Sequence, residues 1–98
     1  MSMWILQSAE PEDNALTFRL SPGAIKTIGR ASRADFLLDR ALVSRLHCRV
    51  TAGDDTLEVV DLSSTNGTFV NDKRVERATL ANGDRLRVGR IELTVALT

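Results

Sequence analysis

The sequence has few of the residues that characterise several classes of protein. It contains one cysteine, two prolines, one tryptophan and no tyrosine among 98 residues. A small secreted domain normally carries several disulfides, so a single thiol favours a reducing compartment such as the cytoplasm or the nucleus. No apolar run approaches the roughly 18 residues of a membrane-spanning helix, and the N-terminus lacks the pattern of a signal peptide. We therefore expect no membrane segment.

The formal net charge is zero, because 13 Lys and Arg residues balance 13 Asp and Glu residues. Proteins that coat nucleic acid or an anionic membrane need a broad positive field, so neither is an expected partner. Eleven of the 13 cationic residues are arginine, whose planar guanidinium pairs bidentately with phosphate or carboxylate. Codon bias also produces such an excess, so only the positions of the arginines carry information.

Short strands are predicted along the chain. Apolar and polar residues alternate from Leu16 to Leu20 and from Ile91 to Leu97, as they do in half-buried strands. Further strands are predicted at residues 3–7, 24–28, 36–38, 47–51, 57–61, 68–70 and 85–88. Turn residues separate these runs at spacings of roughly 8 to 12 residues, which is typical of an all-β sandwich or small barrel. Without a linker or repeat, residues 1–98 are expected to form a single domain.

The four aromatic residues each lie in an apolar stretch and are predicted to be core residues: Trp4, Phe18, Phe36 and Phe69. A small β barrel that binds single-stranded nucleic acid needs exposed rings on which the bases stack. The expected burial of all four rings is a second argument against nucleic acid as a partner.

Neither a metal site nor a cofactor site is predicted. A structural zinc ion takes four Cys or His ligands, whereas this chain has only the adjacent pair His47 and Cys48. Strand alternation directs Cys48 inward beside Val50, which indicates an inert core thiol. Neither of the glycine-rich nucleotide-binding motifs is present. We expect no cofactor.

A serine hydrolase is the catalytic alternative, because a triad can be assembled from Ser44, His47 and either Asp61 or Asp84. However, Ser44 is not within a Gly-x-Ser-x-Gly elbow. Since a lone histidine more often fixes a loop by hydrogen bonds, we disfavour the hydrolase and expect no enzyme activity.

Two polar segments, residues 28–46 and 61–67, interrupt the strand pattern, and loops on a rigid sandwich often carry binding residues. Together they contain residues suited to capturing a phosphoryl group, which needs guanidinium, hydroxyl and backbone donors. Arg30 and Arg45 supply charge, and Ser44 and Thr65 supply hydroxyls. The amide of Asn66 both donates and accepts, which suits a peptide backbone. This chemistry alone leaves phosphoserine, a phosphorylated metabolite and sulfate open as ligands.

Four blocks of residues resemble, in order, the motifs of the forkhead-associated (FHA) domain family. They are Gly29-Arg30, Ser44-Arg45-x-His47, Asp61-x-Ser63-Ser64-Thr65-Asn66-Gly67-Thr68 followed by Asn71, and Leu80 with Gly83-Asp84. The match extends over residues 4–97, which is nearly the whole chain. The resemblance implies a sandwich of two twisted, mainly antiparallel sheets with about eleven short strands and binding loops at one end. It also implies binding of phosphothreonine in an extended peptide.

Roles for individual residues follow from the same resemblance. Arg30 and Ser44 would contact the phosphate, Arg45 and Thr65 would add donors, and Asn66 would hold the peptide main chain. The remaining positions would support the site structurally: Gly29, His47 and Gly67. The partner is therefore expected to be a phosphothreonine-containing protein or peptide segment.

A phosphate-independent interaction scaffold is the other alternative, because β sandwiches often associate through a sheet face.

The resemblance also implies that the domain discriminates between peptides by the residue three positions after the phosphothreonine. Leu42 lies near the expected specificity loop and favours an apolar residue at that position of the peptide. Modules of this kind are often embedded in larger proteins.

Overall fold

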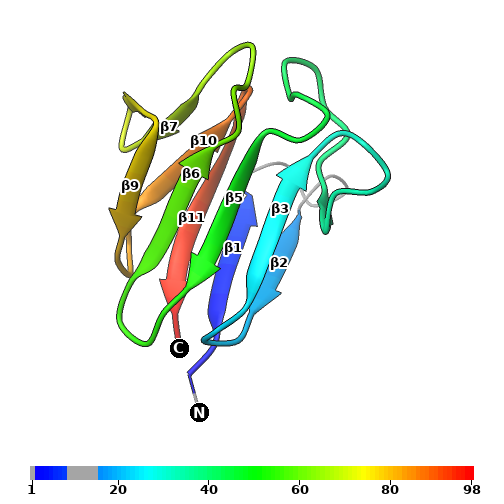
Figure 1. Ribbon diagram of the computed structural model, residues 1–98. Coiled ribbons are helices and arrows are strands. Elements are labelled where there is room, and N and C mark those ends of the chain that lie inside the picture. The colour runs from blue at the N-terminus through cyan, green and yellow to red at the C-terminus, as the bar shows by residue number, and fades with distance from the viewer. Residues whose placement is uncertain (1, 9–15) are drawn as a thin grey trace.

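The computed structural model describes residues 2–8 and 16–98, which form two packed sheets (Figure 1). One sheet contains β1 (Trp4–Ser8), β2 (Thr17–Leu20), β7 (Thr68–Val70), β8 (Lys73–Val75), β10 (Arg85–Val88) and β11 (Ile91–Leu97). The other contains β3 (Ile25–Gly29), β4 (Phe36–Leu37), β5 (Cys48–Ala52), β6 (Leu57–Asp61) and β9 (Arg77–Leu80). Within these residues no helix is long and apolar enough to span a membrane.

The strand order is β2-β1-β11-β10-β7-β8 in the six-stranded sheet and β4-β3-β5-β6-β9 in the five-stranded sheet. Neighbouring strands pair antiparallel, apart from the short parallel pair β3–β4. The predicted all-β sandwich of two mainly antiparallel sheets is confirmed. Strands β3 and β6 end, and β5 begins, at the same end of the sandwich, so the loops that join them converge there (Figure 1).

The core lies between the sheets and follows the predicted alternation. In β5, Cys48, Val50 and Ala52 are buried while the residues between them are partly exposed. Full burial of one large aliphatic side chain contributes about 1.5 to 3 kcal/mol, so the strands hold together mainly by apolar burial. Burial raises the pKa of the Cys48 thiol to about 12, which keeps it protonated, as expected of an inert core thiol.

Three of the four aromatic side chains pack as predicted. Trp4 is fully buried, and its Nε1–H donates a hydrogen bond to the Gly53 carbonyl (2.8 Å) in the turn after β5, which ties the two sheets together. Phe18 of β2 and Phe36 of β4 stack with ring centroids 4.5 Å apart and pack against the core.

The prediction for Phe69 was wrong. Its neighbours Thr68 and Val70 face the core, so alternation places Phe69 on the opposite, outer face of β7. There the guanidinium of Arg87 lies over the ring, 4.3 Å from its centroid. A cation–π contact therefore covers the ring in place of core packing.

Strands β8 and β9 are not among the strands that the periodicity predicts. Both lie at sheet edges, and most of their residues are exposed. Charged side chains on an edge strand discourage pairing with other chains, but they also remove the apolar alternation on which the prediction depends.

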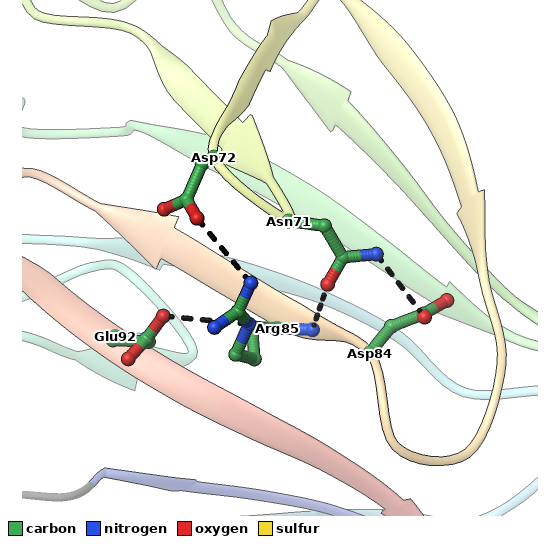
Figure 2. A network of polar contacts seen from close by, with 5 residues as sticks. All are labelled: Asn71, Asp72, Asp84, Arg85 and Glu92. Atoms are coloured by element: carbon green, nitrogen blue, oxygen red, sulfur yellow. Dashed lines mark hydrogen bonds and ion pairs between the residues drawn. The ribbon is translucent and has the colours of Figure 1, made fainter.

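A polar network fixes the β7–β8 turn (Figure 2). Asn71 (φ 49°) and Asp72 (φ 71°) both adopt the left-handed conformation of a tight hairpin turn. The Asn71 Oδ1 accepts from the Arg85 backbone N–H (2.9 Å), and its Nδ2 donates to Asp84 (3.2 Å). The Arg85 guanidinium lies 3.3 Å from an Asp72 oxygen and 3.7 Å from a Glu92 oxygen. The charge of Arg85 is thus balanced within the chain.

Candidate anion-binding site

A pocket of about 810 Å³ opens where the loops after β3, β4 and β6 converge. All five residues predicted to contact a ligand line it: Arg30, Ser44, Arg45, Thr65 and Asn66. They come from two segments that are separated in the sequence, and the strand order of the five-stranded sheet brings these segments together.

Arg30 follows the last residue of β3 and is anchored by two hydrogen bonds. Its backbone N–H donates to the Ser44 carbonyl (3.0 Å), and its Nε–H donates to the Val43 carbonyl (3.1 Å). The anchored Nε orients the guanidinium of this pocket-lining residue, and no hydrogen bond joins its terminal nitrogens to another of the described residues. Within the described part of the chain, neither Arg30 nor Arg45 forms an ion pair with an acidic side chain.

His47 is fully buried beneath the pocket and braces both loops. Its Nδ1 accepts the backbone N–H of Ser44 (3.0 Å), and its Nε2 lies 2.7 Å from the Gly67 carbonyl. Because a carbonyl only accepts, the proton must be on Nε2, and the ring is the neutral tautomer. The histidine therefore couples the loop that carries Ser44 to the loop that carries Asn66.

These bonds do not form a catalytic pair. Both nitrogens of His47 bind backbone groups, and the Ser44 Oγ accepts the Thr65 backbone N–H (3.0 Å). A serine nucleophile needs its hydroxyl within hydrogen-bond reach of the base. The geometry predicted for a Ser44–His47 hydrolase is absent from these contacts.

The β6–β7 loop is held by Asp61 at the end of β6. One carboxylate oxygen accepts the hydroxyls of Ser64 (2.5 Å) and Thr68 (2.7 Å), and the other accepts the Ser64 N–H (3.1 Å). Burial raises the pKa of Asp61, but the hydrogen bonds from Ser64 and Thr68 lower it by more, so the net pKa falls below the ordinary 3.8. Asp61 is therefore charged at neutral pH, and its three hydrogen bonds hold the β6–β7 loop.

Asn66 is held at the mouth of the pocket, where its Nδ2 donates to the Leu42 carbonyl (3.1 Å). Leu42 adopts a φ of 69°, a conformation that is unfavourable for a leucine, and its side chain is 43% exposed. This bond connects the β4–β5 and β6–β7 loops directly at the rim.

Gly29 and Gly67 meet backbone requirements. A Cβ on Gly29 would lie 2.1 Å from the Arg45 carbonyl oxygen, so any side chain would separate β3 from the loop before β5. Gly67 has a φ of +92° and accepts the His47 bond. Both glycines are adjacent to residues that line the pocket.

Other pocket residues were missed by the sequence reasoning: Asp39, Arg40, Ala41, Val43, Leu46 and Ser63. Most lie in the irregular β4–β5 connection, where no periodicity indicates which side chains face the pocket. The supporting role of Asp61 was missed too. Its signal was an Asp followed three residues later by Ser64, a spacing at which an aspartate commonly caps a turn.

Comparison with known proteins gives the family. The family model of the FHA domain matches residues 26–89. The chain is 42% identical over 81 residues to the ABC transporter ATP-binding/permease protein Rv1747 of Mycobacterium tuberculosis, covering 83% of this chain and 9% of that protein. It is 41% identical over 70 residues to the glycogen accumulation regulator GarA of the same species, covering 71% of this chain and 43% of GarA. The chain thus spans less than half the length of either relative.

A solved structure supports the match along the whole fold. An FHA domain studied for phosphothreonine-dependent FHA domain interactions superposes with a TM-score of 0.84 at 35% identity, covering 98% of this chain and 96% of that chain. The four sequence blocks, from Gly29 to Asp84, all lie within residues 26–89, which the family model matches. The chain therefore belongs to the FHA domain family.

Proposed function

We propose that the chain is a phosphothreonine-dependent binding module that docks a phosphorylated protein or peptide segment through this pocket without chemical turnover. The observation that carries the proposal is the state of Arg30 and Arg45, two of the three arginines that line the pocket. Arg30 and Arg45 line the pocket, and within the described residues neither belongs to an ion pair. A dianionic phosphate would supply the missing partner through charge-assisted hydrogen bonds.

The assignment of roles rests on the same contacts. Arg30 and Ser44, which are joined through backbone hydrogen bonds, would bind the phosphate, with further donors from Arg45 and Thr65. Asn66 at the rim would bind the peptide main chain. Its Nδ2 is engaged by Leu42, which leaves the amide oxygen available to accept a peptide N–H.

The size of the pocket favours a peptide over a free anion, because about 810 Å³ exceeds the space needed by a phosphate ion and lies within the range of sites for drug-sized ligands. Preference for phosphothreonine over phosphoserine is supported by the structural relative, which was studied for phosphothreonine-dependent interactions. Leu42, exposed at the rim, supports an apolar residue in the peptide beyond the phosphothreonine.

Calorimetric titration with one peptide in three forms tests the proposal. The phosphothreonine form should bind with micromolar affinity, which corresponds to about −8 kcal/mol, the phosphoserine form more weakly, and the threonine form without measurable heat. The sequence of the peptide is first selected from an oriented phosphothreonine library on the protein itself. Equal affinity for the threonine and phosphothreonine forms would instead support a phosphate-independent scaffold.

A further inference from the structure

The turn between β10 and β11 lies at the same end of the sandwich as the pocket, although it belongs to the other sheet (Figure 1). Gly89 in this turn has a φ of +63° and packs against the β4–β5 loop. A Cβ built on Gly89 would lie 3.0 Å from the Val43 Cγ2, 3.1 Å from the Leu42 carbonyl carbon and 3.2 Å from the Ala41 oxygen. These distances are shorter than ordinary van der Waals contacts, so the loop packs closely against Gly89 and leaves no room for a side chain there.

The segment that rests on Gly89 also holds two of the proposed ligand-binding side chains. The Leu42 carbonyl accepts Asn66 Nδ2–H (3.1 Å), and the Val43 carbonyl accepts Arg30 Nε–H (3.1 Å). Any displacement of residues 41–43 therefore changes the position of both groups.

A side chain at position 89 would move this segment in one direction. Val43 is only 3% exposed and belongs to the close-packed core, so it has little room to move inward. The segment must instead shift outward, toward the pocket, by a few tenths of an ångström. The groups of a binding site must be held within about 0.5 Å of their productive geometry, and a shift of this size uses a large part of that tolerance.

We infer that Gly89 is a positioning residue for the binding site: the absence of a side chain in the β10–β11 turn sets the position of residues 41–43 and, through their carbonyls, of Asn66 and Arg30. The inference rests on the proposed function for its consequence in binding. The positioning itself is a property of the free protein and is measurable without any ligand.

The experiment compares Gly89→Ala with Gly83→Ala. Gly83 also has a positive φ, of +94°, but nothing lies within 4 Å of a Cβ built there. Both variants therefore place a Cβ on strained backbone, and only Gly89→Ala places it against a neighbour. Gly89→Asn is the second variant, because asparagine adopts the left-handed conformation more readily than alanine and keeps the protein folded if backbone strain dominates.

Two readouts apply to each folded variant. In spectra of the free protein, the Asn66 side-chain amide and the Arg30 Nε–H resonances should shift in both Gly89 variants and stay at their wild-type positions in Gly83→Ala. In calorimetry with the library-selected phosphothreonine peptide, both Gly89 variants should bind about tenfold more weakly, which is the loss of roughly one hydrogen bond. Gly83→Ala should bind as the wild type does.

Wild-type resonances and affinity in Gly89→Asn would overturn the inference, as would an equal loss of affinity in Gly83→Ala. Shifted resonances with unchanged affinity would overturn it too, because the positioning would then have no consequence for binding. If the wild-type protein binds no phosphothreonine peptide, the proposed function fails instead. The free-protein spectra alone then decide whether Gly89 positions Asn66 and Arg30.

Discussion

Arg30 and Arg85 are both exposed arginines, but their surroundings differ. Arg85 lies between Asp72 and Glu92 in a network that ties the β7–β8 turn to β10 (Figure 2). Within residues 2–8 and 16–98, Arg30 is anchored only by neutral groups, through the Val43 carbonyl and a backbone bond to Ser44. Among the described residues, one guanidinium is thus balanced within the chain and the other is held in place with its charge unpaired. Such an arrangement is expected where the counter-charge arrives with a ligand.

The supporting networks differ in the same way. The network around Arg85 is solvent-exposed, and exposed ion pairs contribute about 0 to 1 kcal/mol each. The network near the pocket is centred on the fully buried His47 and on Asp61, whose three hydrogen bonds are partly buried. The polar residues near the pocket therefore contribute to stability as well as to the proposed binding.

The largest effect is expected from Arg30→Ala. Removing the guanidinium leaves the bound phosphate without its main counter-charge, so affinity for the phosphothreonine peptide should fall by about 2 to 5 kcal/mol. Calorimetry measures the loss, and Arg85→Ala is the matched control. If the two variants lost the same affinity, the contrast between the two arginines would have no functional meaning.

The next effect is expected from Asp61→Asn. The variant loses a charged acceptor and places an amide N–H against the Ser64 donors, so the free energy of unfolding should fall by about 1.5 to 3 kcal/mol. Chemical denaturation at neutral pH measures this. Wild-type stability in the variant would show that the β6–β7 loop is held by other contacts.

The lowered pKa of Asp61 also predicts that the stability of the protein depends on pH. Because the folded-state pKa of Asp61 is lowered from 3.8, its contribution is complete above pH 3.8 and is lost as the pH falls through the lower folded-state value. Asp35 and Asp84 also have lowered pKa values and add to the same acid sensitivity. Melting curves between pH 5 and about pH 2 should therefore show a smaller decline for Asp61→Asn than for the wild type.

A smaller and more selective effect is expected from Asn66→Ala. Affinity for the phosphothreonine peptide should fall by about 1 kcal/mol, because one hydrogen bond to the peptide main chain is lost. Affinity for inorganic phosphate, followed by the shift of the Arg30 Nε–H resonance, should not change. An equal loss for both ligands would place Asn66 on the phosphate instead.

The smallest effect is expected from Arg85→Ala itself. The loss of two exposed ion pairs should lower the free energy of unfolding by less than about 1 kcal/mol and leave peptide affinity unchanged. Thermal unfolding and calorimetry measure the two quantities. A large loss of stability would mean that the network around Arg85 is a structural centre comparable to the one around Asp61.

Most of the fold could be predicted from the sequence because apolar alternation is strong wherever a strand has one face in the core. The strands that were missed, β8 and β9, are exposed edge strands and have no such signal. Phe69 was wrongly assigned to the core for a related reason. An aromatic side chain in an apolar stretch suggests burial between the sheets, whereas the Phe69 ring lies on the outer face and is covered by Arg87.

The candidate site was predictable where residue types are chemically distinctive. Five of the residues that line the pocket were found because guanidinium, hydroxyl and amide groups cluster in two loops. The contribution of Gly89 and the hydrogen bond from Asn66 to the Leu42 carbonyl could not be predicted, because they depend on a close approach between segments that are distant in the sequence. Packing of this kind leaves no periodicity and no characteristic residue type.

The most direct test of the account is a titration of ¹⁵N-labelled protein with the library-selected peptide in its phosphothreonine and threonine forms. The account predicts that only the phosphothreonine form shifts the Arg30 Nε–H, the Ser44 amide and the Asn66 side-chain resonances. The Arg85 Nε–H resonance should remain fixed throughout. Shifts centred on Arg85, or equal shifts with both peptide forms, would contradict the claim that the unpaired pocket arginines are held for a phosphate.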